Sequence, residues 1–422
     1  MKGGDLRKAS RIGISGNKSL FSMKGGHIMK RFFLLCLLVG TIVFSGVCQA
    51  AEVPGVTDTE IKLGCYTALS GTLAYMGKAL TEGAISYFNE VNAKGGVYGR
   101  KIVFIVEDDE YKPARSLALA RKLITQDNIF AFVAPMGTAT NLAAYPFIES
   151  QKVPIVGLLS ISDAVTQPPL PYAFVLTTPQ SIEAKVMVDY ASRDLKLKSL
   201  GILYQNDEWG QNAYKQALSQ MEKWKKQFTI VQTFERLAVD LSSQAIKMKE
   251  ANPEGVILYA LGKEAALFIK EITKMGWKPR LFGPAGLNDP TNLDLIGPGS
   301  EGLVIPVSYY PMDSDKPGIK KFLEAMKKYY PKSTPSMMGL MGWSAADLFV
   351  HCAQKIGRDL TREKLIDTLE SLKDYDQGIT VPLTFTKIGQ SPDPRRGQRG
   401  SMLGEIVKGN WTALSGWIKP IE

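Results

Sequence analysis

Hydrophobic residues after position 56 fall into short continuous runs that alternate with longer amphipathic segments, as strands alternate with helices. Gly95-Gly96 and Pro113 mark the end of one expected helix and the start of the next. Uninterrupted apolar strands are typical of a parallel sheet buried on both faces. This first series predicts strands at 61–65, 102–106, 129–134 and 153–158, and helices at 77–93, from 113 and at 139–150.

A second series of the same kind begins at residue 200. It predicts strands at 200–204, 228–234, 255–259 and 281–282, with helices at 210–224, 241–251 and 264–275. Two successive series of this kind predict an α/β fold class with two doubly wound parallel-sheet lobes. Beyond them we expect helices at 318–329, 341–356 and 362–371 and strands at 381–385, 404–408 and 411–414. A turn at 408–410 joins the last two strands, and the Pro- and Arg-rich stretch 391–399 is expected to be a surface loop.

Residues 29–50 have the pattern of a Sec signal peptide. Lys30 and Arg31 precede the apolar run 32–47, and Cys48-Gln49-Ala50 supplies small residues for cleavage after Ala50. Export in this way predicts a periplasmic protein. The run is short for a membrane-spanning helix, but a retained anchor and, through Cys48, a lipoprotein stay open. Residues 1–28 are interpreted as an upstream extension outside the fold.

Composition places the 422-residue chain, with 45% hydrophobic and 22% charged residues, among globular proteins large enough for two lobes. Residues 1–50 contribute eight basic residues and one acidic residue to the net charge of +10, which leaves 43 basic and 40 acidic residues. So small an excess gives no electrostatic case for nucleic-acid binding. Cys65 and Cys352 fall in an expected strand and helix, and we expect two buried free thiols rather than a disulfide.

Hydroxyl-bearing loops follow the third and fourth expected strands, at 136–140 and 160–163. In open α/β sheets, ligands bind beyond the carboxyl ends of the strands, at helix N-termini. Hydroxyl and backbone N–H groups can bind a carboxylate there without a formal positive charge. Simple helix capping explains the same Ser and Thr residues equally well.

Catalytic and metal chemistry find little support in the sequence. Asp108-Asp109-Glu110 could suggest a metal site, but calcium needs more oxygen ligands at set spacing, so a solvated loop is expected. His351 is the only histidine after the expected signal peptide, and a triad or zinc site would depend on it alone. The glycine-rich stretch 94–100 lies between a helix and a strand, the wrong context for phosphate binding. We therefore expect no enzyme, no metal and no cofactor.

One segment carries a family resemblance. Residues 92–101, Asn-Ala-Lys-Gly-Gly-Val-Tyr-Gly-Arg-Lys, closely resemble a motif of the substrate-binding proteins of branched-chain amino acid ABC transporters. The strand and loop at 61–71 and the turn at 206–210 are similar to the same family. The resemblance, from about Val56 onward, implies a type I periplasmic binding fold with two lobes, three crossover strands and a hinge. It implies lobe 1 at 56–177 plus 307–377 and lobe 2 at 178–306 plus 378–422.

The resemblance also implies the binding residues. The family's carboxylate-binding hydroxyl falls at Thr138, the two positions that clamp the same carboxylate fall at Ser160 and Ser162, and the aromatic wall of the first loop falls at Tyr75. The full set that we expect to contact the ligand is Tyr75, Gly137, Thr138, Ser160, Ser162, Gln180, Trp209, Gly262 and Ala285.

The side of the site that would bind an amino group departs from the family pattern. An acidic position falls at Gln180, the family's tyrosine falls at Trp209, and its glutamate falls at Ala285. Burying an ammonium without a partner costs several kcal/mol, and a cation–π contact with Trp209 returns only about 0.5–2 kcal/mol. Tyr75 and Trp209 would instead flank a flat or apolar ligand.

These residues predict the monomeric extracytoplasmic solute-binding component of an ABC transporter, which delivers a small carboxylate-bearing solute to a membrane permease. A branched-chain or related amino acid is the family default, and an aromatic or other non-amino carboxylate is the alternative. A sensory ligand-binding protein for a membrane partner is the alternative class.

Overall fold

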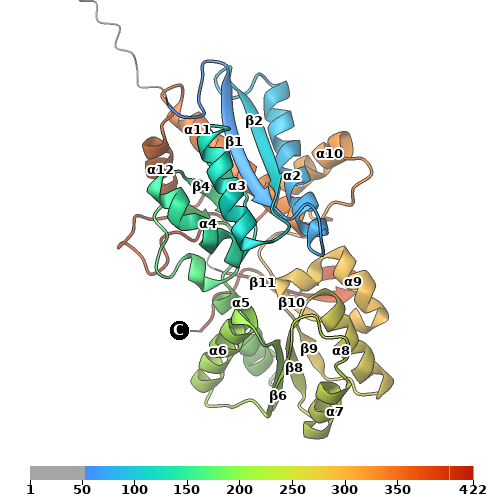
Figure 1. Cartoon of the computed structure of the whole chain (residues 1–422). Coiled ribbons are helices and arrows are strands. Elements are labelled where there is room, and N and C mark those ends of the chain that lie inside the picture. Colours follow the sequence, from blue (N-terminus) through green and yellow to red (C-terminus); the bar gives the residue numbers. More distant parts are fainter. Residues whose placement is uncertain (1–52, 399, 422) are drawn as a thin grey trace, which may run out of the picture. The chain divides into compact units, whose positions relative to one another are not determined.

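The computed structural model of the chain describes residues 53–398 and 400–421 (Figure 1). The predicted extension at 1–28 and signal peptide at 29–50 lie outside the described residues. The described residues form two α/β lobes, each built on its own sheet. This architecture confirms the fold class that the alternating pattern predicted.

The first lobe contains a five-stranded parallel sheet in the order β2-β1-β3-β4-β5. The strands are β1 (Glu60–Thr67), β2 (Lys101–Asp108), β3 (Ala131–Val133), β4 (Ile155–Leu158) and β5 (Ala173–Val175). Their apolar side chains enter two cores, one shared with α2 (Ala74–Ala93) and α11 (Met337–Ile356), the other with α3 (Pro113–Thr125) and α4 (Thr138–Ser150). Because helices cover both faces, β4 is buried at every position. Helices α10 (Pro317–Tyr329) and α12 (Arg362–Glu370) pack beside α2 and α11.

The second lobe contains a seven-stranded mixed sheet in the order β12-β11-β10-β9-β8-β6-β7. The strands are β6 (Leu200–Gln205), β7 (Ile230–Phe234), β8 (Gly255–Tyr259), β9 (Arg280–Phe282), β10 (Val304–Val307), β11 (Met402–Val407) and β12 (Asn410–Ala413). Strands β6 to β10 are parallel, whereas β11 and β12 form the predicted antiparallel hairpin. Helices α5 (Gln180–Asp189) and α6 (Glu208–Lys223) share one core with the sheet, and α7 (Ser242–Ala251) and α8 (Gly262–Lys274) share the other (Figure 1). Short α9 (Pro290–Ile296) packs against α8.

The stretch after α12 differs from its prediction in two ways. Residues 381–385 form no regular strand; Leu383 makes only an isolated bridge to Tyr375, and Leu383 and Phe385 enter the core that contains α2 and α11. The predicted surface loop is wrong for 394–398, because these residues are buried, with Arg395 and Arg396 against acidic partners and backbone carbonyls.

Three crossings connect the lobes, and their residues hydrogen-bond to one another. Thr178 lies between β5 and α5, Ser308 follows β10, and Gly400 precedes β11. The Thr178 hydroxyl donates to the Gly400 carbonyl at 2.9 Å and pairs with the Ser308 hydroxyl. The Tyr309 hydroxyl donates to the Leu176 carbonyl at 3.1 Å. Hydrogen bonds thus connect the three crossings to one another. This arrangement suits a hinge in which a few residues absorb the rotation of one lobe against the other.

Cysteine and histidine side chains have packing roles here. Cys65 and Cys352 are both buried free thiols, as predicted. His351 stacks on Tyr375 with ring centroids 4.0 Å apart, and burial lowers its pKa.

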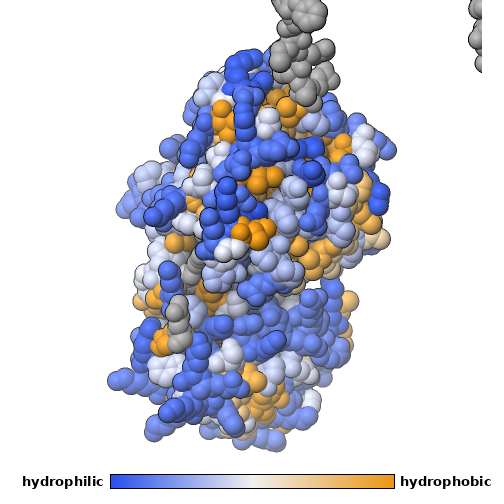
Figure 2. Space-filling view, turned by 90° about the vertical axis from the view of Figure 1, so that its left-hand side faces the viewer, coloured by the Kyte–Doolittle hydropathy of each residue, from blue (hydrophilic) through white to orange (hydrophobic). Residues whose placement is uncertain are grey.

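Among the described residues, no helix combines the length and apolarity needed to cross a bilayer. On the face shown in Figure 2, hydrophilic residues predominate and hydrophobic ones form small separate groups.

Candidate functional site

The two hydroxyl loops predicted from the sequence meet at the carboxyl edge of the first sheet. Thr138 is the first residue of α4, and its Oγ1 lies 2.8 Å from Oγ of Ser160, which follows β4. The Ser162 backbone N–H donates to the Ser160 hydroxyl at 3.2 Å. The structure therefore brings together the three residues expected to bind a carboxylate. The Ser162 hydroxyl also accepts the Ala164 N–H at 3.3 Å, so capping is part of its role.

Gly137 shapes this loop through its backbone. It precedes α4 with φ of 108°, a conformation that L side chains rarely adopt, and its N–H donates to the Leu159 carbonyl at 2.9 Å. A Cβ at this position would lie 2.6 Å from the ring of Tyr111. The Tyr111 hydroxyl accepts the Thr138 N–H, and burial raises its pKa. Tyr111 thus covers the loop, a contact that the sequence analysis missed.

Gln180 and Trp209 lie together on the second lobe. The Gln180 amide donates to the Trp209 carbonyl at 2.5 Å and accepts from the Asn212 side chain at 2.9 Å. These hydrogen bonds satisfy the N–H and the oxygen of the buried Gln180 amide and connect α5 to the start of α6. The Trp209 ring packs edge-on against Tyr259, with centroids 5.5 Å apart.

Tyr75 and Gly262 approach the same residue from different lobes. Tyr75, half-buried near the start of α2, shares a hydrogen bond with Asn292 of α9, and burial together with nearby Asp289 raises its pKa. Gly262 begins α8 with φ of 51°, and a Cβ there would lie 3.3 Å from the Asn292 side-chain oxygen. Asn292 is therefore a meeting point of the two lobes.

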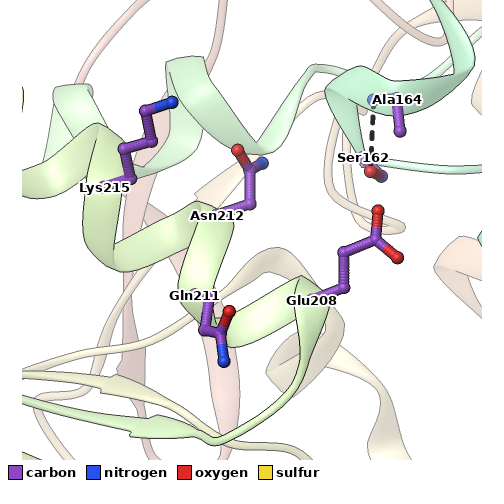
Figure 3. A pocket seen from close by; sticks show the side chains of 6 residues that line it. All are labelled: Ser162, Ala164, Glu208, Gln211, Asn212 and Lys215. Atoms are coloured by element: carbon purple, nitrogen blue, oxygen red, sulfur yellow. Dashed lines mark hydrogen bonds between the residues drawn. The ribbon is translucent and has the colours of Figure 1, made fainter.

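A hollow of about 250 Å³ separates the Ser162 loop from α6. It is lined by Ser162, Ala164, Glu208, Gln211, Asn212 and Lys215 (Figure 3). Glu208 extends from α6 toward Ser162, so the two lobes face each other across this space. The lining carries charges of both signs, on Glu208 and Lys215.

Ala285, where the family pattern has a glutamate, contributes a backbone group instead. Its N–H donates to the carboxylate of Glu183, one turn into α5. Glu183 is buried, and burial raises its pKa to about 8 against the opposing effects of that N–H and of Arg396. Glu183 was not predicted from the sequence; its one available signal was an acidic residue in the largely apolar segment 182–188.

Arg396 lies fully buried behind the hydroxyl loop. Its guanidinium donates to the carbonyls of Thr177 at 3.0 Å and Ser162 at 3.2 Å, and forms an ion pair with Asp393 at 3.1 Å. Burial lowers its pKa. Arg396 therefore holds the backbone from which the Ser160 and Ser162 hydroxyls project, although the sequence placed it on the surface.

The acidic residues at 108–110 brace the first loop. Asp108 accepts from the backbone N–H of Leu69 at 2.9 Å and from the Ser70 hydroxyl at 2.6 Å. Despite its burial, these bonds lower its pKa to about 2. Asp109 is buried and accepts from the Ser116 hydroxyl at 2.8 Å. The predicted solvated loop is therefore wrong for Asp109.

The model of a protein family described as periplasmic binding protein matches residues 60–410. The chain belongs to the periplasmic binding protein family. Membership confirms the resemblance to substrate-binding proteins of branched-chain amino acid ABC transporters. It also makes the chain a member of a family of extracytoplasmic solute-binding proteins.

Similar proteins span most of this periplasmic binding protein. A "Leu/Ile/Val-binding protein homolog 7" from Brucella abortus (strain 2308) is 26% identical over 372 residues, which cover 84% of this chain and 90% of the relative. A fatty acid ABC transporter substrate-binding protein from Thermomonospora curvata is 26% identical, with a TM-score of 0.76 and coverage of 87% and 94%. An R. palustris solute-binding protein in complex with benzoate is 20% identical, with a TM-score of 0.73 and coverage of 86% and 97%. Together they confirm the type I periplasmic binding fold.

Proposed function

We propose that this protein is the solute-binding component of an ABC transporter and captures a small carboxylate-bearing molecule between its lobes for delivery to a membrane permease. The observation that carries the proposal is the contact between Thr138 and Ser160, whose hydroxyl oxygens lie 2.8 Å apart at the start of α4. Hydroxyl and N–H donors arranged in this way suit a carboxylate.

Closure is part of the proposal. Ser162 lies on lobe 1, and α6 faces it from lobe 2 across the hollow (Figure 3). The bonded crossings allow the lobes to rotate as units, and a ligand that contacts both lobes favours the closed form. The closed, liganded form is the state that a permease would recognise.

The proposed ligand is a small carboxylate, and an amino acid is the first candidate. One relative is named a Leu/Ile/Val-binding protein homolog, and one similar structure is that of a fatty acid ABC transporter substrate-binding protein. The experiment therefore includes both types of acid. An aromatic or other non-amino carboxylate is the alternative that Ala285 suggests.

The experiment is a thermal-shift and calorimetric titration of protein freed of co-purified solutes by unfolding and refolding. Leucine, valine, benzoate and octanoate are compared with leucinamide and benzamide, which lack the carboxylate. Binding to the folded state raises the melting temperature by mass action, so at least one acid should stabilise the protein and neither amide should. Equal stabilisation by an acid and its amide, or none by any acid, would contradict the proposal.

Two variants locate the carboxylate. Thr138→Val and Ser160→Ala should each weaken acid binding by about 1.5–3 kcal/mol, the contribution of a hydrogen bond to a charged group. Thr125→Val, at the far end of α3, and Ser150→Ala, at the other end of α4, are the matched controls. The Thr125 hydroxyl bonds within α3, and the Ser150 hydroxyl bonds the Phe147 carbonyl and the Gln151 side chain, away from the hydroxyl loops. Unchanged binding in both site variants would place the carboxylate elsewhere.

A further inference from the structure

Asp163 connects the two lobes through its side chain. It follows Ser162 in the loop after β4 of the first lobe, and its carboxylate accepts hydrogen bonds from two helices of the second lobe. The Ser181 hydroxyl of α5 donates to one carboxylate oxygen at 2.9 Å, and the Asn212 side chain of α6 donates to the other at 3.3 Å. Hydrogen bonds to an ionised acceptor are stronger than those between neutral groups. One carboxylate of lobe 1 therefore binds both α5 and α6 of lobe 2.

Local capping does not account for these two bonds. The Asp163 backbone carbonyl accepts the N–H groups of Thr166 and Gln167 at 2.9 and 2.8 Å and so supports its own turn. Among the residues that the structure describes, the hydrogen bonds of the carboxylate go to lobe 2 alone. The side chain of Asp163 thus serves the contact between the lobes.

Asn212 lies at the centre of this contact. Its amide donates to acceptors in both lobes, to Asp163 and, at 2.9 Å, to the side-chain oxygen of Gln180. The Gln180 backbone N–H in turn donates to the Ile161 carbonyl of lobe 1 at 2.6 Å. Asn212 also lines the hollow that faces Ser162 (Figure 3). Movement of α6 away from the Ser162 loop would therefore lengthen the bond between Asn212 and Asp163.

A second contact between the lobes lies on the other side of the second sheet (Figure 1). Tyr75, near the start of α2, shares a hydrogen bond with Asn292 of α9. Helix α9 packs against α8, whereas α5 and α6 share the core on the opposite face of that sheet. A rotation that moves the lobes apart must therefore break at least one of these contacts.

We infer that Asp163 is a latch, whose bonds to Ser181 and Asn212 hold the lobes together independently of a solute. This goes beyond the proposed function, in which a ligand that contacts both lobes favours the closed form. The latch stabilises the closed form through contacts that no solute atom supplies, so solute-free protein already populates it. Asp163 is not among the residues that line the hollow, and it raises affinity through closure rather than through contact with the solute.

Energy transfer between two dyes, one on each lobe, measures the latch without any solute. Lys94→Cys at the end of α2 and Lys274→Cys at the end of α8 supply the labelling positions, since these side chains are 79% and 70% exposed. The thiols of Cys65 and Cys352 are buried and stay unlabelled. Protein freed of co-purified solutes by unfolding and refolding should show closed molecules beside open ones.

Removal of the latch should shift this distribution toward the open form. Asp163→Ala removes the acceptor of both bonds and should lower the ratio of closed to open molecules roughly tenfold or more. Asn212→Ala and Ser181→Ala each remove one bond, should lower the ratio less, and keep the test available if Asp163→Ala does not fold. Ser219→Ala is the matched control on α6, because its hydroxyl donates to the Gln216 carbonyl within that helix, and it should leave the ratio unchanged.

Solute binding distinguishes a latch from a merely structural role. For an acid that binds wild-type protein, the apparent dissociation constant is inversely proportional to the closed fraction while that fraction is small. In Asp163→Ala and Ser181→Ala it should therefore rise by the same factor by which the closed-to-open ratio falls, and the acid should dissociate faster. A variant that only loses stability would lower the melting temperature without this matched change.

The outcomes separate the latch from the proposed function. The latch is overturned if solute-free wild-type protein shows only the open form, or if Asp163→Ala and Asn212→Ala keep the wild-type ratio. A lower ratio without the matching loss of affinity overturns it as well. None of these results contradicts the proposed function, because acids can still bind. Failure of every acid to bind contradicts the proposed function, while the solute-free measurement still decides the latch.

Discussion

Removal of the buried guanidinium of Arg396 should both destabilise the protein and loosen the loop that contains Ser160 and Ser162. Arg396 is fully buried, and its guanidinium donates to the carbonyls of Thr177 and Ser162 and to the Thr166 hydroxyl at 3.0–3.2 Å. It also forms the ion pair with Asp393. Arg396→Met keeps most of the aliphatic volume and removes every one of these donors.

The expected magnitude follows from the groups left behind. Breaking a buried ion pair by removing one partner costs about 3–5 kcal/mol. The carbonyls add to this cost where they lose their donors. We therefore expect the free energy of unfolding to fall by at least about 3 kcal/mol.

Denaturant unfolding of ligand-free protein measures this change, and Arg358→Met is the matched control. Arg358 also pairs with an aspartate, Asp58 at 3.3 Å, but the two side chains are 57% and 93% exposed. An exposed pair contributes about 0–1 kcal/mol, so the control should stay close to wild type. Acid binding should weaken in Arg396→Met, because the Ser160–Ser162 backbone loses its support.

Equal unfolding free energies for Arg396→Met and Arg358→Met would refute the reasoning. So would full acid affinity in a destabilised Arg396→Met protein, since the loop would then keep its geometry without the guanidinium. The double variant Arg396→Met with Asp393→Asn provides a further check. It should be less destabilised than the two single variants added together, because both substitutions remove the same ion pair.

Further predictions concern the backbone, the thiols and the pH dependence of stability. Gly137→Ala should lower stability by about 1–3 kcal/mol in thermal or denaturant unfolding, because φ is 108° and the new Cβ would lie 2.3 Å from the Thr140 hydroxyl; stability equal to wild type would contradict this. Cys65 and Cys352 should resist an aromatic disulfide reagent until the protein unfolds, since both are buried and burial raises the pKa of Cys352 to about 12; rapid labelling of native protein would contradict their placement. Burial raises the pKa of Glu183 from 4.5 to about 8, so the folded ligand-free protein holds this proton more tightly than the unfolded chain. As the pH rises from 4.5 to about 8, the free energy of unfolding of the wild-type protein should therefore fall relative to that of Glu183→Gln, by up to about 1.4 kcal/mol per pH unit. Parallel pH profiles of the two proteins would contradict the raised pKa of Glu183.

Local patterns identified most of the regular elements. Strands such as β4 and β8 are buried at every position, so they are continuous apolar runs in the sequence. The shorter β5 and β10, of three and four residues, and the helix α5 were missed, because so few residues establish no periodicity and α5 is apolar on much of its surface.

The anion side of the candidate site followed from chain order. In a parallel sheet the carboxyl ends of adjacent strands lie at one edge, so loops after the third and fourth strands had to come together. The 2.8 Å contact between Thr138 and Ser160 is the result. For these residues, sequence position determined spatial position.

The other half of the site depended on contacts that no local pattern records. Arg396 belongs to a Pro- and Arg-rich stretch that resembles a surface loop, yet its acceptors lie more than 200 positions earlier in the chain. The surroundings of Glu183 are formed by residues that are distant in the chain. Ala285, about 100 residues later, donates an N–H to its carboxylate, and Tyr259 lies nearby. Periodicity and strand order were enough to predict most strands and helices of the two sheets and the hydroxyl loops, because these features follow from local sequence. Which charged side chains are buried, and which groups they contact, depends on residues that are distant in the chain, so no local pattern predicts it.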